Sequence, residues 1–207
     1  MTYANLLSTF WIVVSVLLFC LLRKKGVFEK ILFRVLFVTV ILLLWVSTSL
    51  LPVENWLFTF ESPESAFQYR EGRGEIHGIL YGNDSYMIAF SDSSGSFRRF
   101  IAHRSEDGYK LPSVFGMRRV ARVGGAGGHL DVNHVRNTDD FYIVGLKFLD
   151  GGELSVYDRD GVEISEMTYV LVPMHSDSYV VYIAMFVESF TDDFYFYING
   201  ERMDIVR

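Results

Sequence analysis

Three residues with metal-ligating side chains, His129, Asp131 and His134, lie close together in the sequence. A hydrolytic zinc site needs about three such ligands converging on the ion and an open position for water. Alternate side chains of a β-strand point to the same face, so His129 and Asp131 would share one face. His134 would point to the other face unless a bulge intervenes. A metal-assisted hydrolase therefore stays open as an alternative, and polar histidines at a strand edge are the simpler interpretation.

Arginines form the second group of candidate site residues. Residues 98–122 hold seven basic and two acidic residues, whereas residues 138–207 hold four basic and 14 acidic ones. The segments "FRRFIAHR" and "MRRVARV" interleave cations with apolar residues, as two neighbouring strands would if one face of the sheet were basic. The candidate binding residues are Arg98, Arg99, Arg104, Arg118, Arg119 and Arg122.

A basic face of this kind would suit an anionic partner. The planar guanidinium group binds phosphate and carboxylate through paired hydrogen bonds, so the partner could be anionic lipid, a cell-wall polymer or an envelope protein. Ion pairing between the arginine-rich strands and the acidic strands is the structural alternative. Residues 60–207 carry a net charge of −9, which argues against nucleic acid as the partner.

Other catalytic chemistries lack their sequence patterns. The glycine-rich segment "RVGGAGGHLDVNH" has neither the spacing nor the Gly-Lys-Ser/Thr ending of a phosphate loop, and we expect a long, flexible hairpin connection there. A nucleophile elbow is missing, and the single thiol, Cys20, lies in an apolar run. No cofactor is therefore predicted.

Most of the chain after residue 57 has the pattern of an antiparallel β fold. Runs rich in Val, Ile, Tyr and Phe alternate with turn formers such as Gly82-Asn83-Asp84 and Asp150-Gly151-Gly152. The Asn-Gly pair in "DFYFYINGERMDIV" predicts a tight hairpin. In "SYVVYIAMFVESF" both alternating faces are apolar, which indicates a central strand that is covered on both sides. The class is mainly β, an antiparallel meander closing into a sandwich or an open barrel.

One short helix precedes these strands. In "ESPESAFQYREG", Ser62 can cap the helix, Pro63 fits its first position, and Gly72 or Gly74 can end it. We expect this helix to dock on one edge of the sheet, close to a membrane.

Two apolar segments near the N-terminus predict transmembrane helices, at about residues 4–22 and 31–51. Neither Met1–Leu22 nor Val35–Val53 contains a charged residue, and each is near the roughly 20 residues that cross a bilayer core. The first run lacks a basic start and a cleavage site, so an uncleaved anchor fits better than a signal peptide. The expected domains are a transmembrane hairpin over 1–57 and a β domain over 58–207.

The distribution of basic residues predicts the orientation of this hairpin. The connection at residues 23–30 and its flank carry five cations, whereas the segment before the first helix carries none. These cations are Arg23, Lys24, Lys25, Lys30 and Arg34. Short basic loops stay in the cytoplasm, so we expect this loop inside and both termini outside a cell membrane.

The segments "TFESPESAFQYR", "GNDSYMIAFSD" and "FYFYINGERMDIV" resemble small uncharacterised membrane-anchored surface proteins of Gram-positive bacteria. This resemblance implies an anchor followed by a compact β domain that ends in an Asn-Gly hairpin, and it implies no activity. The leading hypothesis is a non-enzymatic binding module with an accessory, sensor or immunity role. A surface hydrolase and a subunit acting through its helices are the alternatives.

Overall fold

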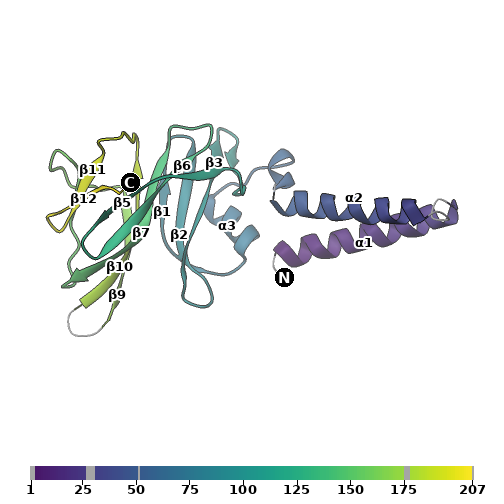
Figure 1. Cartoon of the computed structure of the whole chain (residues 1–207), viewed down its shortest axis with the longest axis horizontal. Helices are drawn as coiled ribbons and strands as arrows, with labels where there is room; N and C mark the ends of the chain where they lie inside the picture. The colour runs from purple at the N-terminus through teal and green to yellow at the C-terminus, as the bar shows by residue number, and fades with distance from the viewer. Residues whose placement is uncertain (1–2, 27–30, 51, 175–177, 207) are drawn as a thin grey trace.

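The computed structural model describes residues 3–26, 31–50, 52–174 and 178–206. Two long helices and one short helix precede a region built from antiparallel strands, and the helix pair extends away from these strands (Figure 1). The helices are α1 (Tyr3–Lys24), α2 (Ile31–Leu50), the 3-10 helix η2 (Val53–Trp56) and α3 (Pro63–Glu71). The strands are β1 (Glu75–Tyr81), β2 (Ser85–Ser91), β3 (Phe97–Ser105), β4 (Gly108–Tyr109), β5 (Met117–Gly125), β6 (Gly128–Val135), β7 (Phe141–Asp150), β8 (Val156–Tyr157), β9 (Met167–Pro173), β10 (Ser178–Val187), β11 (Tyr195–Ile198) and β12 (Glu201–Ile205).

The two predicted N-terminal helices are present and lie side by side. The start of α1 and the end of α2 lie near the β region, and the end of α1 and the start of α2 lie at the far end of the helix pair (Figure 1). Within the described residues, one helix is long and apolar enough to cross a membrane: Ile31–Thr48, with mean hydropathy 2.4 and no buried residue. The structure therefore supports one candidate span where the sequence predicted two. Of the predicted basic loop, residues 27–30 lie outside the described part.

The short helix α3 begins and ends where its sequence predicts. The Ser62 hydroxyl accepts a hydrogen bond from the Ser65 backbone N–H at 3.2 Å, Pro63 is the first helical residue, and Gly72 ends the helix with φ of 73°. The helix lies on the face of the small sheet, however, and not on an edge as we expected. Its Phe67 ring packs against Phe90 and Phe100, because the apolar side chains of β2 and β3 on that face need a cover.

The strands form two antiparallel sheets. The small sheet is a meander in the order β1-β2-β3-β4, and the large sheet has the order β8-β11-β12-β5-β6-β7-β10-β9. The mainly β class is therefore confirmed, with a large sheet that is more complex than a meander. One apolar cluster joins side chains from both ends of the large sheet, such as Ile198 of β11 and Val181 of β10, so this sheet curls around its own core. We call the side around which it curls the concave face and the opposite side the convex face.

The small sheet covers part of the convex face. Leu80, Met87 and Ile101 of the small sheet share a cluster with Tyr142, Ala184 and other residues of the large sheet. Strand β10 consequently has both faces buried, as predicted: Ile183 lies in the concave cluster, and its neighbour Ala184 lies under the small sheet. Close approach of the two sheets requires a glycine at Gly78, because a Cβ there would overlap the side chain of Thr168.

Two turns with glycine connect neighbouring strands. The predicted Asn-Gly hairpin joins β11 to β12, with φ of 50° at Asn199 and 78° at Gly200, the left-handed values of a type I′ turn. The expectation of a long loop in the glycine-rich segment is wrong. Gly125 pairs with Gly128, so β5 and β6 continue to a tight turn. The glycines are needed because a Cβ at Gly128 would lie 2.6 Å from the Leu146 carbonyl oxygen of β7.

Candidate functional site

The six predicted arginines do not form one basic face. Paired residues of antiparallel strands share a face. Arg122 pairs with Asp131 and Arg119 with Asn133, on the convex face, whereas Arg118 pairs with His134 on the concave side. The small sheet divides its arginines in the same way. Arg99 is on the side of this sheet that faces the large sheet, and Arg98 and Arg104 are on the side that carries α3.

Three of these arginines form ion pairs with acids other than those we expected. Arg122 and Arg119 both reach Asp131, with N···O distances of 3.1 and 3.4 Å. Arg98 lies 2.5 Å from Asp92, and hydrogen bonds from Ser94 and then Arg98 hold the pKa of that carboxyl well below its ordinary value. Neither acid belongs to the acidic segment 138–207, so the predicted pairing between the basic and the acidic strands is not what holds these arginines.

The predicted metal ligands do not converge. His129 and Asp131 lie on the convex face of β6, and His134 lies on the concave side, stacked on Phe141 with its Nε2 2.8 Å from the Thr138 carbonyl oxygen. Asp131 is already engaged by two arginines. Across the described part of the chain, no three His, Cys, Asp or Glu side chains are grouped closely enough to hold a metal ion.

A buried polar cluster connects the two sheets. The Asp140 carboxylate is fully buried and accepts hydrogen bonds from the backbone N–H groups of Asn83 and Asp84 and, at 2.6 Å, from the Ser85 hydroxyl. The Ser85 hydroxyl also lies 3.0 Å from the Tyr142 hydroxyl, and burial raises the pKa of Tyr142 above its ordinary value. Because Ser85 is fully buried as well, this cluster holds the β1–β2 turn and has no access to a substrate.

A polar cleft of about 550 Å³ lies beside that turn. Arg104 lines it together with acidic residues that include Glu61 and Asp84. The rest of the lining is Asn83, Ser105, Glu106, Asp107, Gly108 and Tyr109. Acidic groups outnumber the single cation, so the cleft does not extend the predicted anion-binding face.

The most distinctive surface is the part of the convex face that the small sheet leaves open. We call it the open face, and its apolar members are Leu146, Phe148, Val170, Val172 and Val180. The side chains of Leu146 and Phe148 are 48% and 58% exposed, although both belong to a long strand in the interior of the sheet. Sequence reasoning missed them because alternation alone does not show where a covering sheet ends.

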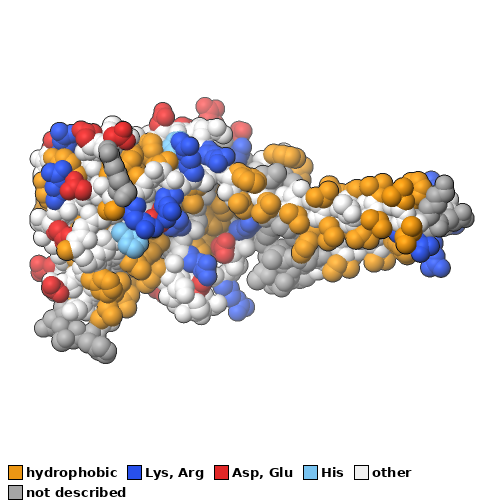
Figure 2. Space-filling model, in the orientation of Figure 1, with side chains coloured by type: hydrophobic (Ala, Val, Ile, Leu, Met, Phe, Trp, Pro, Cys, Tyr) orange, Lys and Arg blue, Asp and Glu red, His pale blue; other side chains and the backbone are white. Residues whose placement is uncertain are grey.

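Basic residues border the open face. His129 pairs with Leu146 across the strands, and Arg122 and Arg119 follow on the next strand. On the visible side of the molecule, an apolar patch adjoins a histidine and a group of basic side chains (Figure 2). This surface can therefore hold a partner that combines apolar side chains with negative charge.

In the described part of the chain, no strand covers the edge of the large sheet beside the open face. Strand β9 ends the order of the large sheet, and from Met167 to Met174 the sequence has no charged residue. Natural sheets usually guard such an edge with charge, bulges or a covering segment. The sequence signal for this edge was the uncharged run of strand formers at residues 167–174. That run alone does not show that the strand lies at an edge, because its place in the sheet depends on pairing with distant strands.

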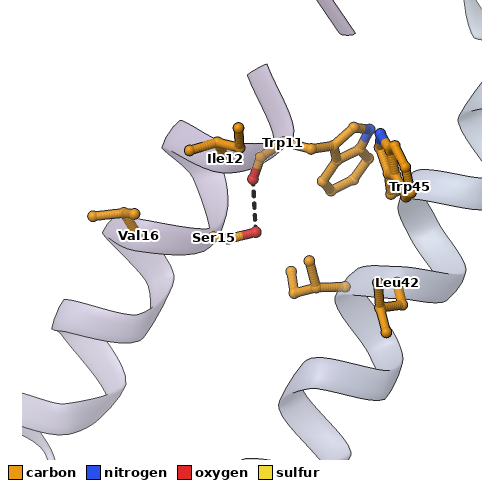
Figure 3. Close-up of a pocket in the computed structure, with 7 residues that line it drawn as sticks. Trp11, Ile12, Ser15, Val16, Leu42 and Trp45 are labelled. Atoms are coloured by element: carbon orange, nitrogen blue, oxygen red, sulfur yellow. Dashed lines mark hydrogen bonds between the residues drawn. The ribbon is translucent and has the colours of Figure 1, made fainter. Parts of the chain in front are cut away.

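A further cavity of about 310 Å³ lies between the two long helices (Figure 3). Trp11, Ile12 and Val16 of α1 and Leu42 and Trp45 of α2 line it, and the Ser15 hydroxyl donates to the Trp11 carbonyl oxygen of its own helix. The lining is almost wholly apolar, so the cavity suits a lipid chain or another apolar helix and no polar substrate.

Comparison with known proteins adds no relative. No known protein family matches the chain, and no curated protein and no solved structure is similar to it. The resemblance to small surface proteins of Gram-positive bacteria therefore stays a prediction.

Proposed function

We propose that the chain is a non-enzymatic binding module that is anchored in a cell membrane and holds an envelope protein on the open face of its β domain. The observation that carries this proposal is the open face itself, where Leu146 and Phe148 stay exposed in the middle of a large sheet. Exposed apolar patches on an otherwise polar surface are typical of protein interaction sites.

The charges around this face favour a partner with acidic groups beside its apolar contact. Arg119 and Arg122 share the single carboxylate of Asp131, so this group of three keeps an excess of positive charge. Arginine at the rim of an interface orients the partner and accelerates association more than it increases affinity. Anionic lipid and cell-wall polymer share this negative charge but have no side chains to fill an apolar sheet face.

The membrane topology that we propose has two spans. An indole N–H of Trp11 in α1 donates to the Thr48 hydroxyl of α2 at 2.8 Å, and this bond joins the two helices. Apolar side chains cover the length of the helix pair, and basic ones cluster at the end away from the β domain (Figure 2). A basic turn between two spans stays in the cytoplasm, and this orientation would display the β domain outside.

Cysteine labelling tests this topology. In a Cys20→Ser background, a membrane-impermeant maleimide should label Asp160→Cys in intact cells and Lys25→Cys only after lysis. The opposite pattern, or labelling of both positions in intact cells, would overturn the proposed display of the β domain.

Photocrosslinking tests the binding surface. A crosslinking amino acid at Phe148 should give a discrete adduct in the native envelope, and one at Val162, which is 62% exposed elsewhere, should not. The double variant Arg119→Gln/Arg122→Gln should reduce the Phe148 adduct several-fold at low salt, because rim charge acts mainly on association. Equal adducts at both positions, or none at Phe148, would contradict the proposal.

The cavity between the helices favours a second candidate, a subunit that acts within a membrane complex through α1 and α2. Its apolar lining by Trp11 and Trp45 could seat a helix of another subunit. Replacing residues 1–50 by an unrelated two-span anchor separates the candidates. A binding module keeps its Phe148 adduct after this replacement, and a helix-based subunit loses its function.

A further inference from the structure

We propose that the outer edge of β9, from Tyr169 to Pro173, is a strand-addition site for an extended, uncharged segment of a partner protein. This inference deepens the proposed binding function and rests on it for the location of the partner. It adds the mode of binding, in which main-chain hydrogen bonds extend the large sheet by one strand.

The direction of the backbone groups in β9 follows from two hydrogen bonds at its ends. Met174 N–H donates to the Ser178 carbonyl at 2.9 Å, and Phe186 N–H donates to the Glu166 carbonyl at 3.1 Å. In an antiparallel pair, alternate residues bond to the neighbouring strand. The even-numbered residues of β9 therefore bond to β10.

The odd-numbered residues consequently point their backbone groups away from the sheet. Tyr169 and Leu171 each offer an N–H and a carbonyl at this edge, and Pro173 offers a carbonyl alone. In the described part of the chain no strand pairs with them, since β9 is the last strand of the sheet. This row of donors and acceptors has the spacing that only another extended chain can match.

The side chains around the edge specify an apolar occupant. Val170 and Val172 continue the open face up to the edge, and Leu171 packs against the concave core on the other side. An added strand would place its alternate side chains beside these two rows. The Tyr169 ring is 45% exposed and offers further contact area. Segments rich in β-branched or aromatic residues, without charge, fit these surroundings.

A flexible segment fits better than a second copy of this chain. The Thr168 hydroxyl donates to the His77 carbonyl at 3.2 Å, so β1 crosses above one end of β9, and no described strand pairs with the outer edge at residues 169–173. Antiparallel pairing of β9 with β9 of a second copy must also accommodate the second β1 on the same face beside this edge. A short extended segment needs no such space.

Peptide selection against the full chain in lipid nanodiscs tests this inference. The probe is a display library of random peptides, and the readout is backbone amide exchange at single-residue resolution. Enriched peptides should be uncharged strand formers that slow exchange at Tyr169 and Leu171 by about tenfold or more, while Val170 and Val172 exchange slowly with and without peptide. Enrichment of charged peptides, protection elsewhere, or no enrichment would overturn the proposal.

Two substitutions complete the test. Tyr169→Lys should weaken the selected peptide by about tenfold, because an inward or edge lysine is a natural guard against strand addition. Tyr157→Lys, at the exposed short strand β8 at the other end of the sheet, is the matched control and should leave binding unchanged. Protection of Tyr169 and Leu171 that grows with protein concentration in the absence of peptide would show a second copy and refute the extended segment.

The outcomes also separate this inference from the proposed function. If Phe148 forms its crosslinked adduct but no peptide slows amide exchange at the β9 edge, strand addition is rejected and the proposed binding module stands. If peptides slow amide exchange at the β9 edge but Phe148 forms no adduct in cells, the open face is rejected as the contact with the envelope protein and the strand-addition site stands.

Discussion

The ring of Phe97 lies flat on the ring of Tyr182, with centroids 4.9 Å apart and planes inclined by 15°. Phe97 belongs to β3 of the small sheet and Tyr182 to β10 of the large one. Tyr182 pairs with Leu146 and Val170, both members of the open face. This stacked pair therefore marks the boundary where the cover of the convex face ends and the open face begins.

The first prediction compares two phenylalanines on the two sides of that boundary. Phe97→Ala should lower the free energy of unfolding by about 2 kcal/mol, because it removes a half-buried ring and its stacking contact with Tyr182. Phe148→Ala should change stability by less than about 0.5 kcal/mol, because that ring is mainly exposed. Chemical denaturation of the full chain in detergent, followed by circular dichroism, measures both. A large loss for Phe148→Ala would show that the open face is covered in the folded protein.

The second prediction concerns two neighbouring aspartates. Asp140→Ala should destabilise the fold by about 3 kcal/mol, because two backbone N–H groups and the Ser85 hydroxyl would lose their buried acceptor. Asp139→Ala is the matched control, since this side chain is exposed, and it should cost less than about 0.5 kcal/mol. Equal effects in thermal unfolding would show that the buried cluster does not hold the β1–β2 turn.

The third prediction concerns the pH dependence of stability. Burial, followed by the charge of Lys110, lowers the pKa of His103 below its ordinary value of 6.5, and Asp140 and Asp84 oppose this only in part. The folded state therefore binds a proton less readily than the unfolded state. Stability should be greatest above pH 6.5 and should fall as the pH drops from 6.5 through the folded pKa.

Variants of two histidines isolate this effect. Denaturation of His103→Gln between pH 7.5 and 5 should show a smaller loss of stability than the unsubstituted chain. His129→Gln, at an exposed position, should keep the loss. An unchanged pH profile in His103→Gln would contradict the role of this histidine.

Local patterns predicted the local structure well. Ser62-Pro63 begins α3, and Asn199-Gly200 forms the hairpin turn between β11 and β12. Both were predictable because capping and left-handed turn conformations depend on the residue itself. The two apolar faces of β10 were likewise predictable, since strand alternation assigns each side chain to a face. What the pattern could not show is what covers each face.

The arginines show why the candidate site was harder to predict. Alternation alone should have divided Arg98 from Arg99 and Arg118 from Arg119, because adjacent residues of a strand point to opposite faces. A register shift between Arg119 and Ala121 then places Arg122 on the face of Arg119. Such a bulge, and the place of β9 at the edge, depend on pairing between distant segments, for which no local signal exists.

The fourth prediction concerns the bond between the two long helices. A double-mutant cycle of Trp11→Phe and Thr48→Val should give a coupling energy of about 0.6 kcal/mol, and at most about 1.7 kcal/mol, as is typical of hydrogen bonds between helices in a bilayer. The cycle isolates the 2.8 Å bond from the packing of the indole ring, which phenylalanine largely keeps. Steric trapping of helix separation in bicelles measures each variant.

Ser15→Ala is the control for this cycle, since the Ser15 hydroxyl bonds to the carbonyl of its own helix and should not couple to Thr48. A coupling energy of zero would mean that α1 and α2 are not joined through this bond in the bilayer. The two-span hairpin would then lose its structural support, because only Ile31–Thr48 meets the requirements of a membrane span by itself among the described helices.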